Sequence, residues 1–260
     1  MRTTDSDTPT LPVALACEAR LGIFQATRRP KRLVKEKIVT PWGEAEVTAR
    51  LGQAHLDTIE AIRACAVRVV WDSEGKASKA LVDLYNVRRM SGQWSGSGFE
   101  TVLTDILSAF VVIRVGKRLR FAGSMLASEI EETMVQGEDG RYLHKIVFGP
   151  VMRGLMAHDV ARKRSYKQIQ ALAMLHGISS ALVRHVMSHR HAPSGGWRLN
   201  ALIEAVCCRL LNATDLKNRR RELRAETAVI LKLGVLIDWQ KERVGYARVG
   251  VVGLPYKSIS

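Results

Sequence analysis

The stretch that most constrains the fold is residues 214–252, where one long basic helix precedes two short apolar runs. At about 100° per residue, Lys217, Arg221 and Arg224 fall within one narrow arc of this helix, and Arg220 lies at the edge of that arc. Apolar residues occupy a separate stripe. The pattern therefore predicts a helix with one buried face and one face that meets negative charge.

The two apolar runs, VLIDW and RVGYARVGVV, follow Gly234 and are joined by the polar residues 240–242. Glycine tolerates the left-handed conformation that ends many helices, and the runs suit a β-hairpin. A helix followed by a hairpin is the second half of a winged helix-turn-helix. The alternative is that the basic run is only a solvated helix face. Other features of the chain are needed to choose between a solvated face and a face that binds a negatively charged partner.

The net charge favours a polyanionic partner. The 260 residues contain 40 Lys and Arg against 25 Asp and Glu, which gives +15 and a pI of about 10.1. Nucleic acid is the commonest polyanion that such a field attracts, and a membrane surface is the rival. The longest apolar runs, 110–113 and 228–237, are far shorter than the ~20 residues of a membrane span. The prediction is double-stranded DNA as partner and no membrane.

A cytoplasmic location is expected. The apolar run near the start, residues 11–16, is interrupted by Pro12 and is too short for a signal sequence. The four cysteines lack both a Cys-x-x-Cys pair and zinc-finger spacing, so they are interpreted as buried thiols in a reducing compartment.

The order of expected elements divides the chain into three. A flexible basic N-terminal arm is predicted for 1–36, a first winged-helix domain for 37–137 and a second for 138–260. Each domain is expected to contain helices followed by a hairpin, and the acidic stretch 129–140 is interpreted as a linker between them. The predicted fold class is α+β, mostly helical, with two tandem winged-helix (helix-turn-helix) domains. Within the first domain the pattern predicts hairpins at 38–50 and 111–121, and helices at 51–71, 81–90 and 97–109, the last capped by Ser97 and Glu100.

The order and spacing of several segments carry a family resemblance. They are ARLGIFQATRRPKR, TPWGEAEVTARLGQAH, LVDLYNVRRMSG, GFETVLTDIL, YLHKIVFGPVM, VRHVMSHRHAPSGGWRLNALIEAVC and LKNRRRELRAETAVILKLGVLIDW. With these segments the chain resembles the theta-type (iteron-binding) plasmid replication initiators, which are built as two tandem winged-helix domains and bind direct repeats at a plasmid origin.

The resemblance implies how the two domains divide the work. The long helix of the second domain would read bases, while the first domain would support phosphate contacts and dimerisation. The helix at 99–107 carries Glu100 and Asp105 and no basic residue, so a reading role is not expected for it. The implied base-reading residues are Lys217, Arg219, Arg220, Arg221 and Arg224.

Other basic residues are candidates for phosphate contacts, because Lys and Arg outside a reading helix most often bind the backbone. Arg219 points nearer the apolar stripe, and its alternative role is an internal ion pair with Glu222 or Glu226. The phosphate candidates are Lys241 and Arg243 in the hairpin, Arg88, Arg89, Lys117, Arg118 and Arg120 in the first domain, and Arg28, Arg29, Lys31 and Arg32 in the arm.

An enzymatic function is not expected. A rolling-circle nicking enzyme needs two metal-binding His flanking an apolar residue, but His189-Arg190-His191 has a charged centre. The i, i+4 pair His185 and His189 is a weak metal candidate. None of the tyrosines lies in a sequence pattern with Arg and His that would indicate a recombinase. Gly116-Lys117 lacks the other residues of a phosphate-binding loop, so nucleotide hydrolysis is not indicated either. Neither a metal nor another cofactor is predicted.

The sequence therefore predicts a sequence-specific DNA-binding plasmid replication initiator in a bacterial cytoplasm. It would bind repeated origin sites, help to open the duplex, exchange between monomer and homodimer, and recruit a host initiator and the replicative helicase. A winged-helix transcriptional regulator is the main alternative, and a rolling-circle nicking enzyme is the less favoured one.

Overall fold

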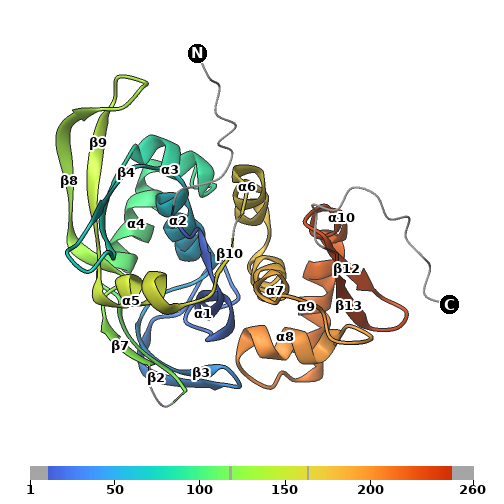
Figure 1. The fold of residues 1–260 in the computed structure, drawn as a ribbon. Helices are drawn as coiled ribbons and strands as arrows, with labels where there is room; N and C mark the ends of the chain where they lie inside the picture. The colour runs from blue at the N-terminus through green and yellow to red at the C-terminus, as the bar shows by residue number, and fades with distance from the viewer. Residues whose placement is uncertain (1–10, 117–118, 163, 248–260) are drawn as a thin grey trace.

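The computed structural model describes residues 11–116, 119–162 and 164–247, and Figure 1 labels most of its elements. Sheets and helices of the first half form one part of the molecule, while helices with a small sheet form the other (Figure 1). The fold is α+β with 41% helix and 30% strand. The prediction of a mostly helical fold with two tandem winged-helix domains is therefore wrong, because much of the first half is sheet.

Two four-stranded antiparallel sheets dominate the first half. Their strands are β2 Leu33–Thr40, β3 Gly43–Ala49, β4 Ala66–Trp71, β5 Ala77–Val82, β6 Phe110–Val115, β7 Leu119–Gly123, β8 Leu126–Gln136 and β9 Tyr142–Phe148. One sheet has the order β2–β3–β6–β7 and the other has the order β4–β5–β9–β8. Pairing of Thr40 with Gly43 and of Val115 with Leu119 confirms the two predicted hairpins.

The helices of the first half share one apolar core with both sheets. They are α1 Ala16–Arg20, α2 Gln53–Ala64, α3 Leu84–Met90, α4 Gly96–Leu107 and α5 Pro150–His158. Helix α4 buries one stripe that includes Phe99 and Ile106, as its amphipathic spacing predicts. Its N-cap is Ser95, whose hydroxyl accepts a hydrogen bond from the amide of Gly98, so the predicted cap at Ser97 is wrong.

The second half has a core of its own. Its helices are α6 Tyr166–Met174, α7 Gly177–Ser188, α8 Leu199–Cys207, α9 Ala213–Ala225 and α10 Thr227–Lys232, and its strands are β11 Trp197–Arg198, β12 Val235–Asp238 and β13 Arg243–Tyr246. The strands form an antiparallel sheet in the order β11–β13–β12. Fully buried Leu182, Ile203, Leu223 and Val244 join α7, α8, α9 and this sheet. The predicted hairpin after Gly234 is confirmed by β12 and β13.

Several predicted boundaries differ from the structure. The helix expected at 51–71 ends at Ala64, because the β-branched and aromatic run after it forms β4. The helix expected at 81–90 begins at Leu84, because the preceding residues complete β5. The acidic stretch 129–140 is largely the edge strand β8 and its turn rather than a linker, so the predicted boundary at 137/138 falls inside the β8–β9 hairpin.

The basic arm predicted for 1–36 is packed against the protein over much of its described length. Leu11, Val13, Leu21 and Ile23 are buried, and the two-residue strand β1 Ala14–Leu15 pairs with β10 Ala161–Arg162. Residues 1–10 lie outside the described residues. Among the described residues of this arm, Arg29 is the first exposed basic side chain.

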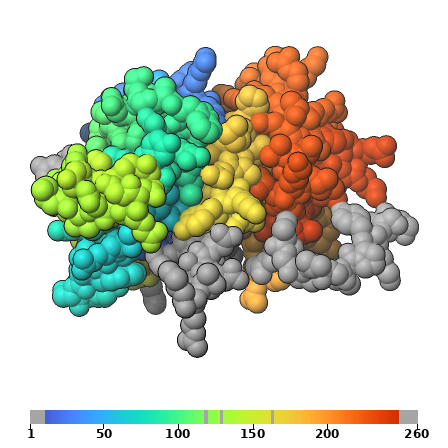
Figure 2. Space-filling model, turned by 90° about the horizontal axis from the view of Figure 1, so that it is seen from above, coloured from blue at the N-terminus to red at the C-terminus, as the bar shows by residue number. Residues whose placement is uncertain are grey.

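Helices α6 and α7 lie at the junction between the two halves. Helix α7 packs against α1 and α2 on one side and against α8 and α9 on the other. Figure 2, a view from above, shows the yellow segment that contains α6 between the blue and green first half and the orange second half. No helix in the described part of the chain is long and apolar enough to cross a membrane.

A buried ionic network holds this junction. Arg184 of α7 is only 1% exposed, and one of its terminal nitrogens lies 2.6 Å from Asp57 Oδ1 and 2.8 Å from Glu60 Oε2, both on α2. Buried Arg164 also pairs with Glu60, and half-buried Arg28 pairs with Asp57. Three guanidiniums from outside α2 therefore share two carboxylates of α2.

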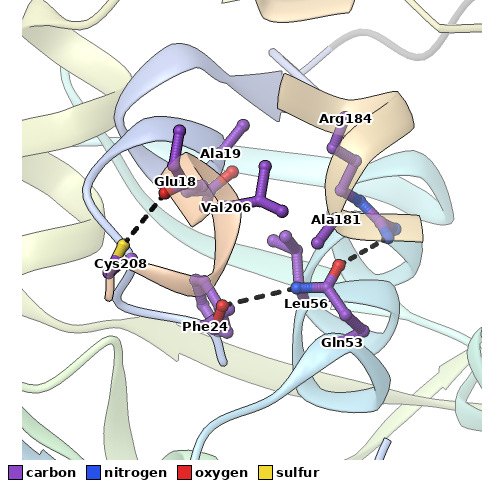
Figure 3. A pocket seen from close by; sticks show the side chains of 11 residues that line it. Glu18, Ala19, Phe24, Gln53, Leu56, Ala181, Arg184, Val206 and Cys208 are labelled. Atoms are coloured by element: carbon purple, nitrogen blue, oxygen red, sulfur yellow. Dashed lines mark hydrogen bonds between the residues drawn. The ribbon is translucent and has the colours of Figure 1, made fainter. Parts of the chain in front are cut away.

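Gln53 extends this network toward a small pocket at the junction. Its side-chain oxygen accepts from Arg184 at 3.1 Å, while its amide nitrogen donates to the carbonyl of Phe24 at 3.4 Å. Figure 3 shows both interactions and places Ala181 of α7 and Val206 of α8 around them. The junction is thus filled by hydrogen-bonded polar groups as well as by apolar side chains.

Gly177 provides the first test of this packing. A Cβ at Gly177 would lie 2.3 Å from Thr27 Cα, so Gly177→Ala should force the junction apart and lower the free energy of unfolding by about 1–3 kcal/mol. Urea denaturation measures the change. Gly245→Ala is the control, because its Cβ would meet no heavy atom closer than Leu236 Cβ at 4.0 Å. Equal stability of the two variants would contradict the close approach at Gly177.

Candidate nucleic-acid interface

Among the described helices, α9 carries the most exposed basic side chains, and local signals define its start. The side chain of Asn212 caps it by accepting from the amide of Asp215 at 2.7 Å, and the Asp215 carboxylate lies in the first turn, where the helix dipole favours negative charge. Fully buried Leu223 fixes which face points inward. The remaining faces of this mostly polar helix are free to carry charge.

The single long helix predicted after residue 214 is two helices. Helix α9 ends at Ala225, Glu226 caps it, and α10 begins at Thr227. The Glu226 carboxylate accepts from the amide of His176, the N-cap residue of α7, at 2.8 and 3.0 Å. The break therefore supplies a cap for another helix, which no periodicity in the sequence could indicate.

Lys217, Arg221 and Arg224 are exposed along one face of α9, as their common arc predicted. Neither Lys217 nor Arg221 has an ion-pair partner among the described residues. The guanidinium of Arg224 lies 4.9 Å from the centre of the Trp239 ring, beside the β12–β13 hairpin. A cation held over an aromatic face keeps its charge while losing freedom. Trp239 thus positions Arg224.

These side chains line a shallow groove between α8 and α9, which we call the α9 groove. Its residues are Asn200, Ala213, Leu216, Lys217, Asn218, Arg220, Arg221 and Arg224. Sequence reasoning missed Asn200, Asn218 and Trp239. Asn218 adjoins Lys217 in the chain and could have been found on the same helix, whereas Asn200 and Trp239 arrive from other elements.

Two of the five predicted base-reading residues are held by carboxylates. Arg219 lies 3.2 Å from Glu222 Oε2, which is the internal pair foreseen as its alternative role. Arg220 pairs with Glu242 at the tip of the hairpin and is only 23% exposed. These pairs fasten α9 to itself and to the hairpin. Of the five, Lys217, Arg221 and Arg224 retain positive charge without a carboxylate partner in the described part of the chain.

The β12–β13 hairpin lies beside the α9 groove. The backbone amide of Lys241 donates to Asp238 Oδ1 at 2.9 Å, which shapes the turn. The guanidinium of Arg243 donates to the carbonyl of Gly196 at 3.4 Å and is half-buried. Phosphate contacts from Lys241 and Arg243 stay a prediction.

A second groove, the junction groove, lies between the segment after α1 and the end of α8. Its lining is Gly22, Gln25, Ala26, Thr27, Arg29, Lys31, Leu33, Glu36, Ile38, Val206, Cys207, Cys208, Arg209 and Arg219. Arg29, Lys31 and the neighbouring Arg32 are exposed, as a phosphate-binding role requires. Arg219 of α9 borders this groove too, so basic residues far apart in sequence line one surface.

Arg28 differs from its neighbours. Its guanidinium pairs with Asp57 and donates to the carbonyls of Leu172, Ala173 and Leu175 at the end of α6. A side chain engaged in this way satisfies free helix carbonyls. Arg28 therefore has a structural role that the basic cluster in the sequence did not reveal.

The other phosphate candidates that the structure describes lie in the first half and do not line the α9 groove. Arg88 and Arg89 lie in the last turn of α3, near the ring of Tyr85. Exposed Arg120 of β7 stands opposite Arg114 of β6. Lys117 and Arg118 lie outside the described residues.

The histidines expected to be weak metal candidates form an aromatic cluster. The Nε2 atoms of His185 and His189 are 3.3 Å apart, and the His185 ring meets the edge of Trp42 at 4.9 Å between centroids. His189 in turn contacts the ring of Trp197. Among the described residues, no three His, Cys, Asp or Glu are grouped so that they could hold a metal ion.

All four cysteines carry free thiols. Burial raises the pKa of Cys65 to about 12 and that of Cys208 to about 11, so neither is a thiolate at neutral pH. Cys208 lines the junction groove, and burial also raises the pKa of Cys207, which lines it too, so the neutral thiol is favoured at both positions.

Comparison of the chain with protein-family models, with curated proteins and with solved structures gave no match.

Proposed function

We propose that the protein binds double-stranded DNA in a sequence-specific way through α9 and initiates plasmid replication from repeated sites. The observation that carries the DNA-binding part is the exposed face of α9, where three cations stand beside a hairpin and have no carboxylate partner among the residues that the structure describes. The resemblance to theta-type initiators supports the replication part.

The chemistry of the α9 groove suits the edges of base pairs. An α-helix fits the major groove of B-DNA, where Arg pairs two donors with O6 and N7 of guanine and Asn pairs with N6 and N7 of adenine. Arg221 and Arg224 supply the first kind of group, and Asn218 supplies the second. Arg224 is held by Trp239, which reduces the conformational entropy that it would lose on binding.

The phosphate backbone would extend from this helix to the junction groove. Arg29 and Lys31 line that groove together with Arg209 at the end of α8. Arg209 keeps 63% of its side chain exposed although it lies 3.5 Å from Asp215. Binding should weaken steeply with salt, because each neutralised phosphate releases counterions.

The proposed mechanism involves no covalent step. Several copies would occupy repeated sites, bend and locally open the duplex, and recruit a host initiator and helicase in the bacterial cytoplasm. A monomer–homodimer exchange would control occupancy.

Arg221→Ala and Arg224→Ala should each weaken binding to the preferred duplex by about 1–3 kcal/mol and relax preference at one base position, if these side chains read bases. Binding to duplexes selected from a random pool measures both effects. Arg68→Ala is the matched control, because it removes an exposed arginine from β4 in the other half of the molecule. Both α9 variants binding as tightly and selectively as the parent would overturn the assignment of α9.

The selected sites also separate an initiator from a transcriptional regulator. Direct repeats favour an initiator, whereas inverted repeats favour a dimeric regulator. A plasmid that carries the reading frame with its flanking repeats should replicate in a host without another origin. Failure to replicate, with DNA binding intact, would favour the regulator. Strand nicking that is lost when one Tyr is replaced by Phe would instead favour the nicking enzyme.

A further inference from the structure

A second site outside the α9 groove combines one tyrosine with three arginines on the surface of the first half. The guanidinium carbons of Arg88 and Arg89 lie 5.6 and 5.7 Å from the centre of the Tyr85 ring, and that of Arg141 lies 4.5 Å from it. Tyr85 is nevertheless 41% exposed. The sequence did not indicate this cluster, because Arg141 arrives from the turn between β8 and β9.

The three arginines of this cluster differ in whether a carboxylate balances their charge. The guanidinium of Arg141 donates to Asp83 Oδ2 at 2.9 Å and to Asp139 Oδ2 at 2.7 Å, so its positive charge is balanced by these two groups. Neither Arg88 nor Arg89 has a carboxylate partner among the described residues. Two positive charges therefore remain beside an aromatic ring that is partly exposed.

Trp94 adds a second exposed ring. It is 70% exposed and lies in the short loop that joins α3 to α4. Arg88 Nη1 is 3.8 Å from the position of a Cβ on Gly96, so Arg88 reaches from the Tyr85 ring to the start of α4, where this loop ends. A large exposed aromatic side chain leaves apolar ring surface in contact with water, and a ligand that stacks on the ring buries this surface.

We propose that Tyr85, Arg88, Arg89 and Trp94 form a binding site for single-stranded DNA, which we call the Tyr85–Trp94 platform. Unpaired bases stack on aromatic rings and on guanidinium planes, while arginine charges hold the phosphates. Duplex DNA hides the faces of its bases and suits this arrangement less well. The choice of DNA over RNA rests on the proposed function, because opening a duplex leaves a single DNA strand beside the protein.

The test uses the full chain and a fluorescent thymidine oligonucleotide of about 15 nucleotides, a length within the range that single-strand-binding modules cover. Tyr85→Ala and Trp94→Ala should each weaken its binding about tenfold, as expected for the loss of one stacked base. Tyr85→Phe should bind within about twofold of the parent, because the ring rather than the hydroxyl group carries the stacking.

Duplex binding provides the counterpart measurement. The platform variants should keep the parent's affinity for the selected duplex, whereas Arg221→Ala should lose duplex affinity and keep oligonucleotide affinity. If the oligonucleotide still binds the platform but no duplex binds α9, the proposed function fails and the platform stands.

Three results would overturn the platform. They are no binding of the oligonucleotide by the parent, parental affinity in both alanine variants, and loss of oligonucleotide binding in Arg221→Ala. Tighter binding of a uridine oligoribonucleotide than of the thymidine one would overturn the assignment to DNA.

Discussion

Replacing Glu60 by Gln is expected to lower the free energy of unfolding by about 3–5 kcal/mol, because it removes a charge on which two buried guanidiniums depend. Arg164 and Arg184 are 3% and 1% exposed, and both pair with Glu60. Gln keeps the size of the side chain, so the loss comes from electrostatics rather than from a cavity. Urea denaturation at pH 7 gives the change.

Glu74→Gln is the matched control. Glu74 is also paired, with Lys76, but its side chain is 67% exposed. A surface ion pair of this kind is worth about 0–1 kcal/mol, so the control should unfold close to the parent. A Glu60→Gln variant as stable as the Glu74→Gln variant would contradict the buried network at the junction.

The same network predicts how acid affects the parent. Burial alone would raise the pKa of Glu60, but the charges of Arg164 and Arg184 outweigh it and lower the pKa from 4.5 to about 2. A carboxyl whose pKa is lower in the folded state stabilises the fold above the unfolded pKa. This stabilisation is lost as the pH falls from 4.5 towards 2, and Glu60→Gln should lack this part of the acid response.

The network also explains why the junction was invisible to sequence reasoning. Every residue of α2 is buried, including Asp57, Glu60 and Arg63. Local periodicity assigns charged residues to a solvated face. Here their partners lie far away in the chain, since Arg184 is 124 residues from Glu60. Burial that depends on such distant partners cannot be inferred from spacing along one helix.

Elements with a strong local signal were predictable. The turn before Gly43 and the hairpin after Gly234 follow from turn residues between β-prone runs. Strand β8 was missed because its charged residues read as a linker, although an edge strand often carries charges that prevent further pairing. Taking β8 for a linker also led to the mostly helical fold class.

The candidate DNA-binding face was partly predictable for the same reason. The arc that places Lys217, Arg221 and Arg224 together is a property of one helix. The pairing of Arg220 with Glu242 depends on where the hairpin folds back, and the placement of Trp239 over Arg224 does too. Helix geometry thus gave the exposed cations, whereas tertiary structure determined which of them are held.

Acidification provides a separate test of the junction at His185. This imidazole is 2% exposed, and burial lowers its pKa from 6.5 to about 4, helped by the nearby positive charges of His189 and Arg20. The Trp42 ring packs against it from the β2–β3 turn, and the carbonyl of Ala19 lies 3.3 Å from Nδ1. The folded protein therefore holds His185 neutral at pH values where the unfolded chain protonates it.

Acid should therefore lower the free energy of unfolding through His185. A histidine whose pKa is lower in the folded state gives its full stabilisation above pH 6.5 and loses it as the pH falls towards 4. Between pH 7 and pH 4 the loss should reach about 3 kcal/mol, at about 1.4 kcal/mol per pKa unit. Urea denaturation at a series of pH values measures the profile, and His185→Phe should remove this contribution while keeping a ring against Trp42.

His191→Phe is the control, because that imidazole is exposed beyond the end of α7. It should keep the parent's loss of stability between pH 7 and pH 4. The difference between the two variants isolates His185 from the carboxyl groups that titrate in the lower part of the same range. Identical profiles for His185→Phe and the parent would show that the Trp42–His185 contact does not depend on a neutral imidazole, and the junction would then tolerate a charge that its burial should exclude.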